Sequence, residues 1–540
     1  MKRRRFIGVV PLVGIGSLAS YAGIAAEGAK APFRVIYSND TTHILSCRSP
    51  GPERDRPFTD EDLRKSILEA EGVDAHFLQP GLGWIPWWRS SIYSAEDHHA
   101  WLRDKHGVKG VTRIGEYLLG GGDMLKTLVA TCREIGVAPF LSFRLNDGHH
   151  TRDLADALAR GRPTTKMARH YWDNYKAFRI GPNMASWDEC VFDWGIPEVR
   201  EYKFALLEEA CANYDLAGLE LDFLRHWSRF GVSVPLEERR EITNGFVARV
   251  REMLDRTGRE RGLPQRWLSV RVPANSTIRP EQGVDLREMT QAGVDMVNLS
   301  YSYFTWQDGN PGQAREEIGD EGSIYVEMTH TTMTGKATAG SGTQPFLRTT
   351  DEQFYTTARL AYEQGADGVS LFNFPYYRYH VTESIGPFHE PPFHVLPRLK
   401  RRRYLDRQPQ WVFASAGRND SILGDKPLPT ILKRGASQLF SLRMIPEKNR
   451  PADGLLRLRS DEAIDDREIE VRFNGEVLKS VAAEIHPRSD SYAGTWLGKP
   501  SQFACFVLPK SVSLESINEV EVLVSGGIRV RLVYFDLILG

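Results

Sequence analysis

Past residue 32, short runs of apolar and β-branched residues alternate with longer stretches whose apolar residues recur at helical spacing. This alternation predicts a parallel sheet in which each strand is followed by a helix. We expect eight strands, at 33–40, 73–81, 137–147, 216–226, 266–274, 294–304, 323–330 and 366–377. Eight strands predict an α/β fold of the (β/α)8 type, a TIM barrel. A doubly wound open sheet is the alternative, but the count of eight and a span of roughly 350 residues favour the barrel.

Glycine marks the boundary between helix and strand at several places along this repeat. The stretches EGVDAHF, AGVDMVN and QGADGVS each place a glycine at a helix end, directly before an expected strand. Glycine commonly ends helices because it adopts left-handed backbone angles without steric cost. The repeated pattern therefore supports a chain built from similar helix–strand units.

After Pro397 the hydrophobic pattern changes from helical spacing to alternation. The polar stretch 400–411 is a hinge or a last helix, and several alternating strands follow it. Asn474-Gly475 is a typical tight-turn pair between two such strands. We expect a barrel at 32–400 and an antiparallel β-sandwich, jelly-roll-like, at 408–540. The second domain is expected to pack on the barrel, with sugar binding as a further role.

Composition narrows the classes of function. The 540 residues include 69 Lys and Arg against 70 Asp and Glu, so no net field favours nucleic acid or an anionic membrane. Twelve Trp and nineteen Tyr exceed the needs of a core, and flat sugar faces are one use for such rings. Carbohydrate is therefore the expected partner, and the oligomeric state stays open.

The N-terminus has the pattern of an export signal. Arg3, Arg4 and Arg5 precede an apolar run at 7–24 and then small residues. An arginine pair before Phe6 resembles the twin-arginine class of signals, which export folded proteins. A membrane anchor is the alternative, but Gly and Ser interrupt the run. We expect a signal at 1–31 and a periplasmic or extracellular protein.

No pattern in the chain indicates a cofactor or a structural metal. The five cysteines form no CxxC pair, and Cys132 and Cys211 fall in helical stretches, as buried residues. The run GGGD at 120–123 does not fit a dinucleotide-binding loop and is better explained as a helix start. We expect neither a cofactor nor a metal, although one disulfide is possible in principle.

Two expected strands carry acids on a predicted inner face. In the strand at 216–226, Glu220 and Asp222 share one face, opposite Leu219, Leu221 and Phe223. Glu327 is the acid of the strand at 323–330. Reacting groups of such barrels lie at the C-terminal ends of the strands. Paired carboxylates there predict glycoside hydrolysis, in which one acid stays ionised and the other donates a proton.

Structural roles for these acids are the competing explanation. Glu220 lies deeper in the barrel and could bind Arg271 of the next strand. Glu327 could orient a substrate instead of donating a proton. We expect Asp222 as nucleophile or base and Glu327 as proton donor, with the roles interchangeable, and Glu220 as the substitute for Asp222.

A family resemblance joins these residues. The stretch CVFDWGIPEVREYKFALLEEACANYDLAGLELDFLRHW at 190–227 resembles the central segment of glycosyl-hydrolase-like family 10 and related (β/α)8 glycosidases. The matching residues are Pro197, Glu198, Val199, Arg200, Tyr214, Asp215, Gly218, Asp222 and Arg225. ADGVSLFNF at 366–374 resembles the last strand of that family. The resemblance implies a carbohydrate-active barrel with Asp222 as the acid of the fourth strand. Ala217 departs from the family, which has an acid there, and Glu220 is an additional acid.

Polar and aromatic residues gather after the expected strands, where a substrate would bind. Asp147, His149 and His150 could hold a metal, but adjacent histidines rarely converge on one ion, and hydrogen bonds to sugar hydroxyls are favoured. Loop aromatics are expected to form a binding surface, with a core position as the alternative. The expected substrate-binding residues are Asn39, His43, Trp84, Trp87, Trp88, Arg144, Asn146, His149, Arg225, His226, Asn298, Tyr301, Tyr303, Asn373, Tyr376 and Arg378.

Three of these residues bear on the charge of the substrate. Arg144, Arg225 and Arg378 each follow a strand, and together they would suit carboxylate or sulfate groups. Alternatively, Arg225 pairs with a barrel acid. The sequence thus predicts an exported glycoside hydrolase. The alternatives are a carbohydrate-binding barrel without turnover, and a polysaccharide lyase that uses His and Tyr on a uronic-acid glycan.

Overall fold

The structure is a computed structural model of the 540-residue chain. It describes residues 30–47, 56–82, 84–301, 305–307, 309–333, 346–378, 390–415, 428–448, 450–482, 499–525 and 529–540. Almost all of the expected export signal at 1–31 lies outside these ranges. Within them, no helix combines the length and the apolar character that crossing a bilayer requires.

Eight parallel strands close into a barrel, which confirms the predicted fold class. Strand β1 pairs with β2 on one side and with β12 on the other, so the sheet has no free edge. The strands are β1 (Val35–Asn39), β2 (Ala75–Leu78), β5 (Ala138–Arg144), β6 (Gly218–Asp222), β7 (Trp267–Pro273), β8 (Met296–Ser300), β9 (Ser323–Thr329) and β12 (Gly368–Phe372). Each of these strands lies within one of the eight expected ranges.

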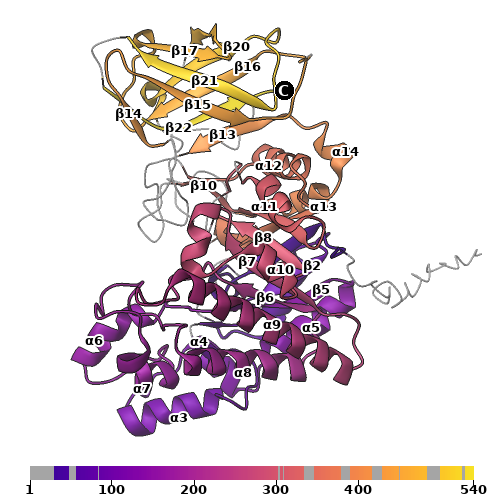
Figure 1. The fold of residues 1–540 in the computed structure, drawn as a ribbon, viewed down its shortest axis with the longest axis vertical. Helices are drawn as coiled ribbons and strands as arrows, with labels where there is room; N and C mark the ends of the chain where they lie inside the picture. The colour runs from indigo at the N-terminus through magenta and orange to yellow at the C-terminus, as the bar shows by residue number, and fades with distance from the viewer. Residues whose placement is uncertain are drawn as a thin grey trace, which may run out of the picture.

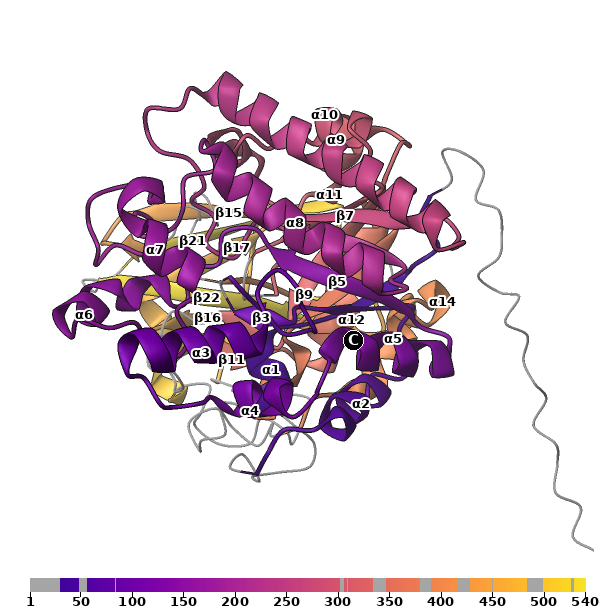
Figure 2. The same cartoon turned by 90° about the horizontal axis from the view of Figure 1, so that it is seen from below.

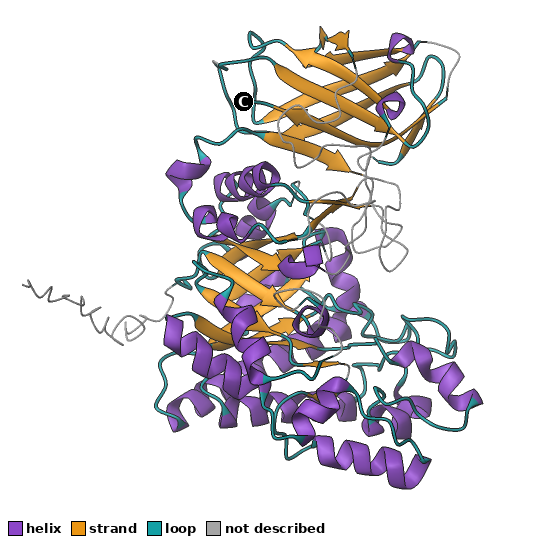
Figure 3. Cartoon of the chain, turned by 180° about the vertical axis from the view of Figure 1, so that it is seen from behind, coloured by secondary structure: helices purple, strands orange, loops and turns teal. Residues whose placement is uncertain are grey.

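Helices enclose this barrel, as Figure 3 shows by colour. They are α1 (Thr41–Ser46), α2 (Asp60–Leu68), α3 (Ala95–His106), α4 (Arg113–Leu119), α5 (Met124–Ile135), α6 (Leu154–Ala159), α7 (Arg169–Phe178), α8 (Pro197–Asn213), α9 (Leu236–Glu260), α10 (Leu286–Gln291), α11 (Pro311–Ile318), α12 (Asp351–Glu363), α13 (Leu396–Leu399) and α14 (Arg402–Leu405). The long helices α8 and α9 lie side by side (Figure 2). Several helices lie in the long connections after β2 and β5, which extend that part of the barrel beyond a minimal repeat.

Apolar side chains fill the lower half of the barrel interior, which is the half at the N-terminal ends of the strands. Its members are Ile36, Ala75, Phe77, Ala138, Phe140, Trp267, Met296 and Tyr325. Two glycines leave room for the rings: a Cβ on Gly218 would lie 2.4 Å from Phe140 Cε1, and one on Gly368 would lie 2.7 Å from Tyr325 Cε1. This filling gives the barrel a solid floor and leaves polar chemistry to its upper half.

The C-terminal strands form two antiparallel sheets, as the alternating pattern predicted. One sheet orders β13 (Trp411–Ser415), β22 (Val530–Ile538), β16 (Gly454–Ser460), β20 (Phe503–Leu508) and β19 (Lys479–Val481), with β14 (Thr430–Leu432) also on β22. The other orders β15 (Ser437–Arg443), β21 (Ile517–Val524), β17 (Ile469–Phe473) and β18 (Glu476–Val477). Asn474 and Gly475, both at positive φ, form the predicted tight turn between β17 and β18.

This sandwich lies beside α12 (Figure 1), and one glutamine joins the two parts. The Gln307 side chain donates to the carbonyl of Trp411 at 2.9 Å and accepts from the backbone N–H of Phe413 at 2.8 Å. The backbone N–H of Trp411 donates to Thr356 Oγ1 of α12 at 2.9 Å. Gln307 follows β8, so these contacts fix the first sandwich strand to a loop at the C-terminal end of the barrel.

The five cysteines are all buried and none forms a disulfide. Cys132 lies in α5 and Cys211 in α8, as their helical spacing predicted. Burial raises the pKa of both thiols, so neither has the character of a reactive nucleophile.

Candidate active site

A polar layer crosses the barrel directly above its apolar floor. Ser142 Oγ donates to Glu220 Oε1 at 2.6 Å, and Asn298 Nδ2 donates to Glu220 Oε2 at 3.2 Å. Ser370 Oγ in turn donates to Asn298 Oδ1 at 2.9 Å. The layer links four strands, β5, β6, β8 and β12, and it places the predicted residues Glu220 and Asn298 inside the barrel, fully buried.

The next residue of β6 on the same face as Glu220 is Asp222. A single arginine joins Asp222 to Glu327, the remaining predicted acid. Arg271 Nε and Nη2 donate to the two oxygens of Glu327 at 2.6 and 2.7 Å, and Nη1 donates to Asp222 Oδ1 at 3.1 Å. Ser300 Oγ also donates to Glu327, at 2.5 Å. Asp222 is 0% exposed and Glu327 is 1% exposed. The alternation rule therefore placed both acids on the inner face correctly, and the structure brings them together through Arg271.

Asp222 is held by further donors at the end of β6. Its Oδ1 accepts from the backbone N–H of Leu224 at 2.9 Å and from that of Arg225 at 3.3 Å. Its Oδ2 accepts from Gln79 Nε2 at 2.8 Å. Both oxygens of Asp222 therefore accept hydrogen bonds, and one of the donors is the Arg271 guanidinium.

Burial raises the pKa of both neighbouring glutamates, but the charges beside them differ. Burial raises the pKa of Glu220 to about 7, and the negative charge of Asp222 adds to the rise. Burial also raises the pKa of Glu327, while Arg271 opposes the rise. Carboxyl groups whose pKa values are raised in this way occur often at acid–base sites.

A second network surrounds Asp40, which follows β1. Tyr376 OH donates to Asp40 Oδ1 at 2.9 Å, and Asn373 Nδ2 donates to Oδ2 at 3.1 Å. Arg144 bridges this acid to the next one, because Nη2 donates to Asp40 Oδ2 at 3.1 Å and Nη1 donates to Asp147 Oδ2 at 3.0 Å. The predicted residues Arg144, Asn373 and Tyr376 thus lie together at the C-terminal ends of β1, β5 and β12.

Asp147 continues the network into a histidine and an arginine. Its Oδ1 accepts from His149 twice, from the backbone N–H at 3.0 Å and from Nδ1 at 2.5 Å. Arg225 Nη2 contacts His149 Nε2. Although burial alone would raise it, the pKa of Asp147 lies well below its usual range because His149 and Arg144 stabilise the charge. His149 is 22% exposed, which makes it accessible to a ligand.

Two loops, after β5 and after β6, together hold the atoms of a conceivable cation site, with His226 in place of His150. Ligand atoms of Asp147, His149 and His226 lie within 4.8 Å of one another. However, the backbone N–H of Gly148 donates to His226 Nδ1 at 2.8 Å, and Arg225 covers the other nitrogen of His149. A cation would have to replace these hydrogen bonds beside two guanidinium groups, so the arrangement fits hydrogen bonding better.

A cavity lies beside this network, between the ends of β2 and β5. Its volume is about 30 Å³. Its polar walls come from Gln79, Ser142, Arg144 and Asp147, and its apolar walls include Trp84 and Trp88. Because Gln79 also donates to Asp222, the cavity adjoins the acid at the end of β6.

The expectation of an exposed aromatic surface is wrong for three tryptophans. Trp84, Trp87 and Trp88 are 2–3% exposed and belong to the main hydrophobic core. The Lys203 ammonium lies 3.7 Å from the centre of the Trp84 ring and occupies one of its faces. Inserted helices cover this loop, and large rings in covered loops become core. Trp84 and Trp88 still contribute edges to the cavity.

Other predicted residues lie elsewhere. Asn39 points to the outer side of the barrel, because Ile36 and therefore Ser38 face inward, and it bonds His76 at 3.0 Å. Asn146 donates to the carbonyls of Phe192 and Ser228, which fixes the loop. Tyr301 is buried and packs against Trp306. The side chain of His43 and all of Tyr303 lie outside the described residues.

Arg378 was expected among the substrate-binding residues, but the structure gives its guanidinium two carboxylate partners. It binds Glu69 at 2.8 Å and Glu390 at 2.6 Å, so its charge is neutralised beside α2. Three residues that the prediction did not include belong to the network: Asp40, Gln79 and Arg271. Asp40 and Gln79 directly follow strands, which could have identified them, and Arg271 lies within β7 on the same strand face as Ser269 and Pro273.

No family model matches the chain, and no curated protein matches it. The family resemblance of residues 190–227 therefore stays a prediction. Among solved structures, the chain is similar to a glycoside hydrolase family 18 N-acetylglucosaminidase from Paenibacillus barengoltzii, at a TM-score of 0.37 and 12% identity over 68% of this chain and 99% of that one. It is also similar to the chitinase ChiA74 from Bacillus thuringiensis, at a TM-score of 0.38 and 9% identity over 93% of this chain and 100% of that one. A third similar structure is the α-L-fucosidase AlfC from Lactobacillus casei, at a TM-score of 0.32 and 11% identity over 69% of this chain and 97% of that one. At these low identities, a proposal about function depends on the side chains of this chain.

Proposed function

We propose that this protein is an exported glycoside hydrolase that cleaves O-glycosyl bonds of a poly- or oligosaccharide. The observation that supports this best is the position of Asp222. This carboxylate ends a barrel strand, where such barrels hold their reacting groups, and it adjoins a cavity through Gln79. It accepts hydrogen bonds from Arg271 and from a backbone N–H, and in this proposal it acts in the ionised form that a nucleophile or base needs.

In this proposal Glu327 donates the proton to the leaving oxygen. Burial raises the pKa of Glu327, which favours its protonated form. The two hydrogen bonds from Arg271 lower this pKa and so favour the charged form. Glu327 must therefore loosen from Arg271 before it can act as an acid. Glu220 lies one layer deeper, fully buried, and we assign it a structural role below Asp222.

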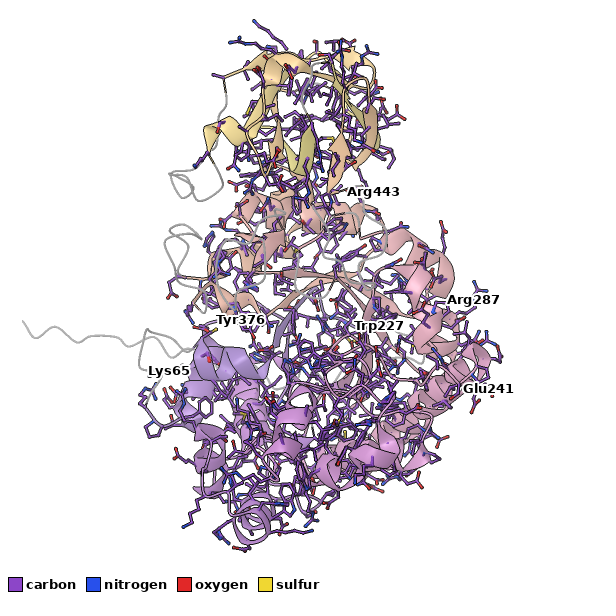
Figure 4. The ribbon with its side chains drawn as sticks, turned by 90° about the vertical axis from the view of Figure 1, so that its left-hand side faces the viewer. Lys65, Trp227, Glu241, Arg287, Tyr376 and Arg443 are labelled. Carbon is purple, nitrogen blue, oxygen red and sulfur yellow. The ribbon has the colours of Figure 1, made fainter. Side chains whose placement is uncertain are left out.

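Release of reducing ends from neutral, uronic and sulfated polysaccharides tests this function. The wild type is compared with Asp222→Asn and with Glu241→Gln, an exposed acid on the outer surface of α9 (Figure 4). We expect release by the wild type and by Glu241→Gln, and a fall of roughly 100-fold or more in Asp222→Asn. Binding without release from any substrate would instead favour a carbohydrate-binding barrel, in which Arg271 holds both acids permanently.

A polysaccharide lyase is the second candidate, and one observation favours it. Arg144 connects Asp40, the partner of Tyr376, with Asp147, the partner of His149. A histidine and a tyrosine in one network could serve as base and acid in elimination at a uronate. A lyase leaves an unsaturated sugar that absorbs ultraviolet light, so following absorbance in the same reactions separates the two mechanisms.

A further inference from the structure

The hydrogen bonds around His149 determine which of its nitrogens carries the proton. A guanidinium can only donate, so His149 Nε2, which contacts Arg225, presents a lone pair. Nδ1 then carries the hydrogen and donates it to Asp147 Oδ1 at 2.5 Å. By the same reasoning, His226 Nδ1 accepts from Gly148, and its proton lies on Nε2. His149 is thus a neutral base that a carboxylate orients, as in hydrolytic triads.

Arg225 covers the basic nitrogen of this pair. The contact joins a guanidinium to a neutral imidazole, and such a bond is weaker than the carboxylate bonds that hold Arg144 and Arg271. A carboxylate or sulfate group is a better partner for a guanidinium than an imidazole is. An anionic ligand at the mouth would therefore attract Arg225 away from His149.

We propose that Arg225 masks His149 in the ligand-free protein, and that a carboxylate or sulfate on the glycan draws Arg225 aside and exposes His149 as a general base. This inference rests on the proposed hydrolase function and adds a substrate class to it, an anionic glycan. It also gives His149 a role that the barrel acids do not fill, because Asp222 and Glu327 both accept from Arg271.

The proton balance of such a reaction can be written out. First, an oxygen of Asp222 bonds to the anomeric carbon while Glu327 protonates the leaving oxygen and the glycosidic bond breaks. Then water attacks the anomeric carbon, its proton passes to His149 Nε2, and the bond to Asp222 breaks. His149 returns this proton through solvent to Glu327, which restores the starting state.

Several charged or titratable groups lie around His149. They are Asp147 and Arg144 from the β5 loop, Arg225 and His226 after β6, and His150 beside it. Burial and then the charge of Arg225 lower the pKa of His149 to about 4, although Asp147 acts in the opposite direction. Removing or moving Arg225 must therefore raise the pKa of His149.

The first experiment measures that pKa by NMR, with no need for turnover. The wild type is compared with the variant Arg225→Gln. The control variant is Arg287→Gln, because Arg287 lies on the outer surface (Figure 4). The variant His149→Gln identifies which NMR resonance belongs to His149. We expect a rise of roughly one unit in Arg225→Gln and on addition of an oligouronate or a sulfated oligosaccharide to the wild type, and no change in the control. An unchanged pKa in Arg225→Gln, or no effect of either anion, overturns the proposal.

The second experiment compares a cleaved anionic glycan with the same glycan after carboxyl reduction or desulfation. We expect cleavage to fall at least ten-fold when the charge is removed, and His149→Gln to lose activity while circular dichroism reports an intact fold. Dependence on carboxylate or on sulfate identifies the source of the anion. Equal cleavage of charged and neutral forms overturns the masking role while the hydrolase function stands. No cleavage of any glycan by the wild type overturns both.

Discussion

Asp222 and Glu327, which come from strands β6 and β9, accept hydrogen bonds from one guanidinium, that of Arg271. The guanidinium also lies 4.1 Å from the centre of the Phe372 ring, so an aromatic face supports it from β12. Two negative charges thus share one positive charge in a buried site. The stability of the barrel mouth and the proposed roles of both acids therefore depend on this arginine.

Replacement of Arg271 by methionine should destabilise the protein strongly. The variant would leave two buried carboxylates without their cation, and breaking a buried ion pair costs about 3–5 kcal/mol. Urea unfolding gives the free energy of unfolding of the variant and of Arg287→Met, a surface control expected within about 0.5 kcal/mol of wild type. A loss below about 1 kcal/mol for Arg271→Met would mean that water already solvates both acids.

The raised pKa of Glu220 predicts a pH dependence of stability. A carboxyl whose pKa rises from 4.5 unfolded to about 7 folded stabilises the folded state below pH 4.5, and this stabilisation is lost as pH rises through 7. Relative to wild type, Glu220→Gln should gain stability between pH 5 and pH 8, by roughly 3 kcal/mol. Unfolding at several pH values checks this, with Glu241→Gln as control. A constant difference across that range would contradict the burial of an ionisable Glu220.

A single methyl group at Gly218 should disturb the barrel floor. A Cβ there would lie 2.2 Å from the carbonyl oxygen of Trp267, which belongs to the paired strand and cannot move alone. We expect Gly218→Ala to lower the free energy of unfolding by at least about 2 kcal/mol. Gly245→Ala is the matched control, because Gly245 is exposed in α9 with no atom within 4 Å of a new Cβ, and it should stabilise the protein by about 0.5–1 kcal/mol. Equal effects of the two changes would count against this account.

Loss of the Gln307 side chain should uncouple the sandwich from the barrel. Gln307→Ala leaves the carbonyl of Trp411 and the N–H of Phe413 without this partner, at a cost of roughly 1–3 kcal/mol. Scanning calorimetry should show the sandwich unfolding at a lower temperature than the barrel. The control Gln291→Ala, at an exposed helix end, should keep the wild-type profile. An identical profile for Gln307→Ala would show that other contacts hold the two parts together.

Periodicity alone predicted the barrel and the inner face of its acids. Glu220, Asp222 and Glu327 point inward because side chains alternate along a strand, and no tertiary information is needed for that. The same rule, applied to β1, predicts that Asn39 faces outward. Ile36 faces the barrel interior, and a residue three positions further along a strand lies on the opposite face. The shared partner Arg271 could not be assigned to Asp222 and Glu327, because the stagger of neighbouring strands decides which residues meet.

Residues in loops were harder to place, for a physical reason. Whether Trp84 or Trp88 faces solvent depends on how the inserted helices fold over the loop, and no local pattern encodes that packing. Arg378 met Glu69 and Glu390, which lie 309 and 12 positions away along the chain. By contrast, Arg144 lies at the mouth as expected because it is the last residue of β5, and Tyr376 lies there because the short helix after β12 turns it toward Asp40.

The filled floor of the barrel has a consequence for the movement of ligands. Apolar rings close the lower half, and the layer of Ser142, Glu220, Asn298 and Ser370 closes the level above it. A ligand that reaches Asp222 therefore has to leave through the opening by which it entered. If the proposed hydrolase function holds, departing and incoming sugars compete for one passage, so accumulated product should slow turnover in proportion to its occupancy of that passage.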